Sequence, residues 1–69
     1  MLFTDVSSER AIKAFKRAGF EIIKQGKHTS MAKGKYIITI PRHRRLNPYT
    51  LKTVIRRGGL TDEEFKELL

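Results

Sequence analysis

Residues 20–41 restrict the fold of this chain more than any other part, because three runs with strand character follow one another with only short turns between them. Gly26-Lys27 predicts the first turn and Lys33-Gly34 the second. Pro41 ends the last run, because proline has no amide hydrogen to give to a sheet. The runs are residues 20–25, 28–32 and 35–40. Strands joined by such tight turns pair antiparallel, so the sequence predicts a three-stranded antiparallel meander.

Helices are expected on both sides of these strands. The first, at about residues 9–18, has an apolar stripe at helical spacing, a serine cap at Ser7 or Ser8, and Gly19 as its end. Asn47-Pro48 opens a second helix, which Gly58-Gly59 ends. The stripes are Ala11, Ile12, Phe15 and Ala18 in the first helix, and Leu51, Val54 and Ile55 in the second. Both stripes are expected to face the core.

A short third helix closes the chain. Thr61 and Glu64 have the spacing of a capping box, and Leu60 is placed to pack against Phe65. A bare three-stranded sheet buries too little apolar surface, so helices must cover one of its faces. We therefore expect residues 1–69 to form one α+β domain of order α-β-β-β-α, the layout of the double-stranded RNA-binding domain.

The charge of the chain is unevenly distributed. The formal net charge is +8, and no acid lies between Ile22 and Thr61. A surface that only provides solubility mixes its signs, so this window is expected to face an anion: nucleic acid, an anionic membrane or an acidic protein. A plain solvated basic surface is the alternative. The candidate RNA-binding residues are Lys24, Lys27, Lys33, Lys35, Arg42, His43, Arg44, Arg45, Lys52 and Arg56.

Several classes of site are not indicated by the sequence. The chain has no cysteine and only two histidines, so disulfides, thiolate–zinc sites and other metal centres are not expected. No motif for nucleotide cofactors or for a serine nucleophile is present, and no cofactor is expected. No apolar run is long enough to cross a membrane and no signal peptide is apparent, so we expect a cytoplasmic protein.

His28 is the candidate for chemistry. RNA carries its own nucleophile, the 2′-hydroxyl, so an imidazole that moves a proton, together with cations that stabilise the phosphate, is sufficient for cleavage without a metal. The alternative is a surface histidine at the mouth of a hairpin. His43 is expected either to act directly in RNA binding or cleavage, or only to orient its loop or pack at the entry of the second helix. Tyr36 alternates with core isoleucines and is expected in the core, and Tyr49 is expected to pack there rather than to stack on a base.

A resemblance to a known family bears on these alternatives. The segments AGFEIIKQGKHTSM and IPRHRRLNPYTLKTVIRRGGLTDEEFKELL resemble the HicA (YcfA-like) toxins of bacterial and archaeal toxin–antitoxin systems. The matching positions, in the order of the family, are Ala18-Gly19-Phe20, Gly26-Lys27-His28, Pro41-Arg42-His43, Thr50-Leu51, Ile55-Arg56, Gly59-Leu60-Thr61 and Glu64-Phe65.

The resemblance implies a double-stranded RNA-binding-like fold, cleavage of mRNA, and inhibition by a HicB-type antitoxin. It also implies that His28 is the catalytic histidine. The family commonly has serine before this histidine, whereas Lys27 stands here as a candidate phosphate contact. The expected function is that of a metal-independent endoribonuclease, the toxin of a type II toxin–antitoxin system. The rivals are a non-catalytic RNA- or DNA-binding module and a protein whose basic face serves only an acidic partner.

Overall fold

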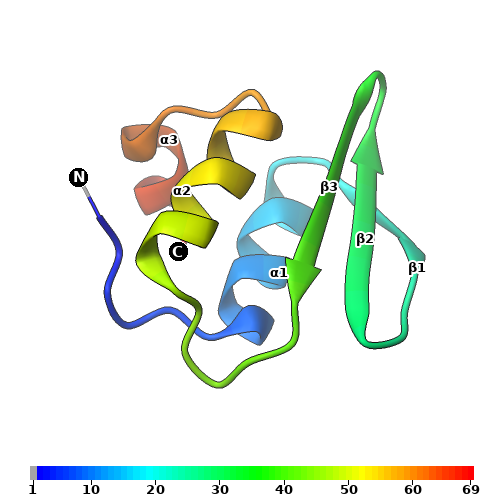
Figure 1. Cartoon of the computed structure of the whole chain (residues 1–69). Coiled ribbons are helices and arrows are strands. Elements are labelled where there is room, and N and C mark those ends of the chain that lie inside the picture. The colour runs from blue at the N-terminus through cyan, green and yellow to red at the C-terminus, as the bar shows by residue number, and fades with distance from the viewer. Residues whose placement is uncertain (1) are drawn as a thin grey trace.

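The computed structural model describes residues 2–69 (Figure 1). Its elements are α1 (Ser8–Arg17), β1 (Glu21–Lys24), β2 (His28–Lys33), β3 (Tyr36–Pro41), α2 (Pro48–Arg57) and α3 (Asp62–Leu68). The strands form an antiparallel sheet of order β1-β2-β3, and the three helices lie on one side of it. The predicted α+β class and the order α-β-β-β-α with a short third helix are confirmed. None of the helices among residues 2–69 is both long and apolar enough to cross a bilayer.

The helix ends follow the predicted capping residues. The Ser7 side chain accepts a hydrogen bond from the backbone N–H of Arg10, so Ser7 rather than Ser8 is the first cap. The Asn47 side chain accepts from the N–H groups of Tyr49 and Thr50 at the start of α2. Thr61 and Glu64 form the predicted capping box of α3. These bonds satisfy amide hydrogens that have no partner within their own helices.

The register of the sheet fixes which side chains face the helices. Met31 of β2 pairs with Ile22 of β1 on one side and with Ile38 of β3 on the other, and Met31 and Ile38 are buried. Side chains alternate along a strand, so the neighbouring residues point to the other face. That face, called here the open face, carries His28, Ser30, Ala32, Ile37 and Thr39.

The two turns differ slightly from their predicted form. The first is a three-residue connection, residues 25–27, and the register of β1 shifts between Ile22 and Lys24, which indicates a bulge. The second lies at residues 34–35, one residue later than predicted. Gly34 has a φ of +58°, a conformation that glycine adopts without steric cost, so the turn is placed by the glycine.

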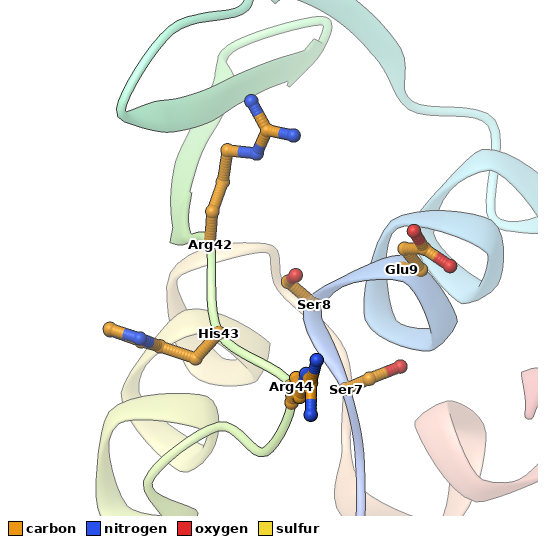
Figure 2. Close-up of a pocket in the computed structure, with 6 residues that line it drawn as sticks. All are labelled: Ser7, Ser8, Glu9, Arg42, His43 and Arg44. Atoms are coloured by element: carbon orange, nitrogen blue, oxygen red, sulfur yellow. The ribbon is translucent and has the colours of Figure 1, made fainter.

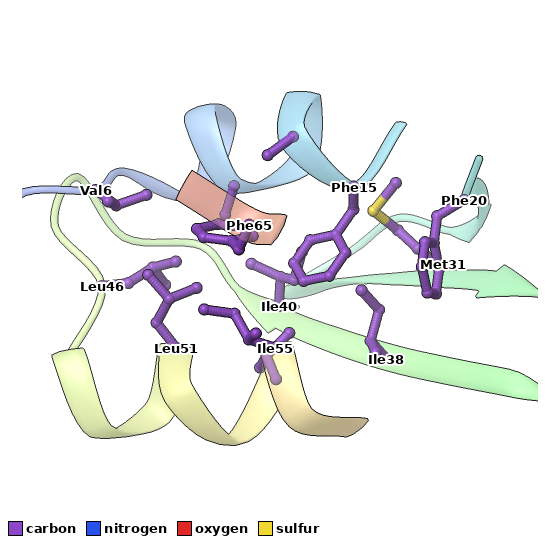
Figure 3. Close-up of a cluster of buried hydrophobic side chains, with 13 residues drawn as sticks. Val6, Phe15, Phe20, Met31, Ile38, Ile40, Leu46, Leu51, Ile55 and Phe65 are labelled. Carbon is purple, nitrogen blue, oxygen red and sulfur yellow. The ribbon is translucent and has the colours of Figure 1, made fainter. Parts of the chain in front are cut away.

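The core lies between the sheet and the helices and contains a cluster of aromatic rings (Figure 3). The Phe15 ring contacts those of Phe20 and Phe65, each with its centroid 5.3 Å away. The buried residues are Val6, Ala11, Ala14, Phe15, Phe20, Met31, Ile38, Ile40, Leu46, Leu51, Val54, Ile55 and Phe65. The predicted stripe of α2 is buried completely. Ile12 and Ala18 of the first stripe and Leu60 are partly buried against this core.

Both expectations for the tyrosines need correction. Tyr36 is on the predicted, helix-facing side of β3, but it stands at the end of the sheet, over Gly59, and is 39% exposed. Tyr49 is 69% exposed, so its expected packing in the core is wrong. Tyr49 precedes Leu51 by two residues, which is a rotation of about 200° around an α-helix, so it points away from the buried stripe.

Candidate active site

His28 is the first residue of β2 and projects from the open face of the sheet. The adjacent Thr29 is buried towards the helices, and the alternation of the strand therefore turns the exposed His28 ring to the uncovered side. Its partner across the sheet is Pro41, at the end of β3. Among residues 2–69 the imidazole makes no hydrogen bond or ion pair, so both ring nitrogens are accessible to a ligand.

A guanidinium is held at the same end of the sheet as this histidine. Arg42 follows Pro41 directly, and its Nη1 donates a hydrogen bond to the carbonyl oxygen of Gly26 over 3.3 Å. Gly26 belongs to the turn that leads into His28. Lys27 is exposed in the same turn, and Lys24 pairs with Ser30, a neighbour of His28 on the open face. The structure thus brings Lys24, Lys27, His28 and Arg42 to one end of the sheet.

The loop that carries the next three basic residues is anchored on the N-terminal segment. The backbone N–H of Ser8 donates to the carbonyl of His43 over 3.0 Å, and that of Leu46 donates to the carbonyl of Val6 over 2.8 Å. In Figure 2, Arg42 points towards the β1–β2 turn, whereas the His43 ring points away from α1. The backbone of His43 therefore helps to fix the loop, while its ring is exposed to solvent.

A comparison of the sequence with protein families matches most of the chain to one of them. Residues 8–60 match the model of a family described as the HicA toxin of bacterial toxin–antitoxin systems. The chain belongs to the HicA toxin family. The matched segment of this HicA chain contains α1, the whole sheet and α2, and includes His28 and Arg42. A comparison with curated proteins found no match.

In the HicA chain, acidic residues from outside residues 22–61 lie close to basic residues of that segment. The Asp5 Oδ1 lies 3.5 Å from the Arg45 Nε, and both side chains are exposed. Glu9 lines the same surface depression as Arg42, His43 and Arg44 (Figure 2). The segment without acids in the sequence is therefore not free of negative charge in the structure. Arg45 is paired with Asp5, whereas within residues 2–69 neither Arg42 nor Lys27 makes an ion pair.

Other predicted basic residues of this HicA chain are separated from His28. The Lys33 Nζ donates to the carbonyl of Ala18 over 2.5 Å on the helix side of β2, and Lys35 lies with its Nζ 5.6 Å from the ring centroid of Tyr36. Both lie at the opposite end of β2, about 17 Å from His28 at strand spacing. Lys52 is partly buried and Arg56 exposed on α2. The ten candidates do not form one continuous cluster around the imidazole.

Some side chains near this site of the HicA chain were not predicted to bind anything. Arg57 joins Thr39, Pro41 and Thr53 in a groove between β3 and α2. The sequence placed it with Lys52 and Arg56 on a basic helix face, which is either solvated or one wall of an RNA groove, but it is not among the ten candidates. The sequence offered Ser8 only as a possible helix cap and Thr29 only as a strand residue, so neither was predicted to bind a ligand. Within residues 2–69 no three histidine, cysteine, aspartate or glutamate side chains converge in a way that holds a metal ion.

Proposed function

We propose that this HicA family member is an endoribonuclease that cleaves mRNA without a metal ion, and that His28 transfers the proton. The observation that supports this most directly is the placement of an exposed imidazole on the open face, beside the Gly26 turn to which the Arg42 guanidinium is bonded. An imidazole with two accessible nitrogens can accept a proton at one nitrogen and donate one from the other, and it needs no further protein partner to do so.

The proposed reaction uses the nucleophile of the substrate. His28 accepts the proton of a ribose 2′-hydroxyl, the 2′-oxygen attacks the adjacent phosphorus, and the bond from phosphorus to the 5′-oxygen breaks. The leaving 5′-oxygen takes a proton from water or from the protonated imidazole. The products are a 2′,3′-cyclic phosphate and a 5′-hydroxyl end, so no electron acceptor or second substrate is required. In-line attack needs a flexible backbone, so the target is single-stranded or locally opened RNA.

The cations nearest to His28 have a separate role in this proposal. Lys27 is exposed in the turn before His28, and it stabilises the charge that grows on the phosphate oxygens during attack. Arg42 is held at the same end of the sheet by its bond to Gly26, and it binds the RNA from that edge. Lys24 extends this contact along the face. The remaining basic residues hold the RNA backbone further away, without reading its sequence. The further candidates are Lys33, Lys35, His43, Arg44, Arg45, Lys52 and Arg56.

The proposed cellular setting follows from the family. The chain acts in the cytoplasm as the toxin of a type II system, and its partner is a folded HicB-like antitoxin. Acids of that partner pair with the cations around His28 and block access of RNA. A net charge of +8 favours such an acidic partner as well as RNA.

The main rival is a module that binds RNA without cleaving it, and His28→Ala separates the two. The exposed position predicts that the variant folds and binds RNA as the wild type does, while cleavage falls about 10²- to 10⁴-fold. Lys66→Ala, an exposed cation on α3, is the control and retains cleavage. The wild type is incubated with single-stranded RNA in the presence of a metal chelator. Cleavage should continue, and the product ends should be a 2′,3′-cyclic phosphate and a 5′-hydroxyl.

Two outcomes would remove the proposal. One is cleavage by His28→Ala at the rate of the wild type. The other is cleavage of an RNA whose scissile nucleotide carries a 2′-deoxyribose, because that substrate lacks the proposed nucleophile. Expression of the wild type and of His28→Ala in parallel, with growth and message integrity followed, tests the same residue in the cell. We expect growth arrest and loss of messages only with the wild type.

A further inference from the structure

A polar pocket lies on the other side of β2 from His28. It has a volume of about 230 Å³ and is lined by Ser8, Glu9, Ile12, Gln25, Thr29 and Arg42. These residues come from α1, the β1–β2 turn, the start of β2 and the loop after β3. Thr29 follows His28 directly, and Arg42 is bonded to the turn beside it. The pocket is therefore reached from the imidazole around the end of the sheet.

Two hydroxyl groups in this pocket have no hydrogen-bond partner within the part of the chain that the structure describes. Ser8 is 8% exposed and Thr29 is 3% exposed, so both side chains are more than nine-tenths buried. In Figure 2 the Ser8 hydroxyl points towards the space beside Arg42. Within the described residues no side-chain oxygen or nitrogen is both sealed from solvent and unpaired, so these two oxygens open onto the pocket. Both are therefore accessible to a polar ligand that enters it.

The charges in the pocket select the class of ligand. Glu9 and Arg42 line it from two different elements and lie apart in Figure 2. A carboxylate only accepts hydrogen bonds and a guanidinium only donates them. Glu9 would repel a phosphate, so the pocket is not another anion site. It fits a neutral molecule that presents donors on one edge and acceptors on another, and the apolar side chain of Ile12 provides a wall for a planar ring.

We infer that this pocket binds the guanine base of the nucleotide next to the cleaved linkage, an inference that rests on the proposed function. Among the four RNA bases, guanine alone has two adjacent donors, N1–H and the N2 amino group, and two adjacent acceptors, O6 and N7. The Glu9 carboxylate accepts from the two donors, and the Arg42 guanidinium donates to the acceptors. Ser8, Thr29 and Gln25 complete the contacts. Glu9 and Arg42 then determine specificity, while His28 remains the group that transfers the proton.

The test compares single-stranded RNAs that differ only in the base beside the cleaved linkage. Inosine lacks the N2 amino group of guanosine, and 7-deazaguanosine lacks N7. Loss of one hydrogen bond to a charged group should lower kcat/KM about 10- to 100-fold for each analogue. Glu9→Ala should remove the difference between guanosine and inosine, and Arg42→Ala the difference between guanosine and 7-deazaguanosine. Glu67→Ala, an exposed acid on α3, is the control and keeps the wild-type ratios.

Binding of the same RNAs to His28→Ala separates this inference from the proposed function. One outcome is that neither the wild type nor any variant cleaves RNA, while His28→Ala binds guanosine RNA about 10-fold more tightly than inosine RNA. This would support the guanine site and contradict the nuclease proposal. If the wild type cleaves all the RNAs equally, or Glu9→Ala keeps the wild-type ratio of guanosine to inosine, the guanine site is wrong and the nuclease proposal stands. Circular dichroism of Glu9→Ala confirms that α1 is intact, since Glu9 lies in its first turn.

Discussion

The Arg42 guanidinium donates a hydrogen bond from Nη1 to the carbonyl oxygen of Gly26, 3.3 Å away. The bond joins the residue after β3 to the turn before β2, so it closes the end of the sheet at which His28 lies. Because Arg42 is exposed, the bond adds little to the stability of the fold. Its consequence is positional, since it holds a cation with four further donors at the end of the sheet where β2 begins.

The first prediction concerns this bond. Arg42→Ala should lower kcat/KM for RNA cleavage about 10- to 100-fold, because it removes a fixed donor that binds the RNA at this end of the sheet. The kcat/KM of Arg42→Lys should lie between those of the wild type and Arg42→Ala, because lysine keeps the charge but lacks the planar guanidinium that can bond to both Gly26 and a ligand. Single-turnover cleavage measures the effect, and urea unfolding should change by no more than about 0.5 kcal/mol. Wild-type cleavage by Arg42→Ala would exclude the residue from the site.

The second prediction concerns the ion pair between Asp5 and Arg45, whose Oδ1 and Nε are 3.5 Å apart. Exposed pairs of this kind contribute at most about 1 kcal/mol to stability, so Asp5→Asn should leave the fold intact. It should strengthen RNA binding, because Arg45 becomes available to a phosphate. Each phosphate contact adds about 0.7 to the slope of log affinity against log salt for single strands. Titrations at several salt concentrations should therefore give a steeper slope for Asp5→Asn.

Glu67→Gln is the matched control for this second experiment, because it removes an equal charge from an exposed position on α3. If Asp5→Asn and Glu67→Gln change the affinity equally and leave the slope unchanged, the effect is one of net charge. Arg45 would then make no contact with RNA.

Local sequence rules predicted the elements of this fold well. The stripe Leu51, Val54 and Ile55 is buried because helical periodicity alone places these residues on one face. Thr61 and Glu64 form their capping box because the bonds involved span only three residues. The same periodicity places Tyr49 about 200° around the helix from Leu51, on the exposed side. The prediction that Tyr49 packs in the core did not take this spacing into account.

The candidate site was predictable only in part, because tertiary contacts assemble it. His28 and Arg42 were both candidates from their residue types, but their meeting depends on the pairing of His28 with Pro41. The absence of acids between Ile22 and Thr61 gave no indication that Asp5 would form an ion pair with Arg45. That contact depends on hydrogen bonds between the N-terminal segment and the loop, such as the one from Leu46 to Val6.

The third prediction concerns the core. The Phe15 ring is fully buried and contacts two further rings, and phenylalanine-to-alanine changes in cores cost about 3–5 kcal/mol. A domain of this length has a free energy of unfolding of about 3–10 kcal/mol. Phe15→Ala should therefore lose between about a third and all of the free energy of unfolding, as measured by circular dichroism and urea titration, whereas Phe15→Leu should lose less. Tyr49→Ala, at an exposed position, should change stability by no more than about 0.5 kcal/mol.

The fourth prediction is a graded series of glycine-to-alanine changes. Gly26 has neither a positive φ nor an atom within 4 Å of an added Cβ, so Gly26→Ala should cost nothing and can gain up to about 1 kcal/mol. Gly34 has a φ of +58° but open space, so Gly34→Ala should cost about 1–2 kcal/mol in backbone strain. Gly59 has a φ of +76°, and a Cβ there would lie 2.9 Å from the Tyr36 ring, so Gly59→Ala should cost more than Gly34→Ala.

A double-mutant cycle separates the two contributions at Gly59. In a Tyr36→Ala background the clash with the ring is absent, so Gly59→Ala should then cost no more than Gly34→Ala does. Urea unfolding of the four proteins gives the coupling energy between the two positions. An equal cost of Gly59→Ala with and without the Tyr36 ring would mean that backbone strain accounts for the whole effect. The packing of this tyrosine over the turn before α3 would then contribute nothing to the cost of the substitution.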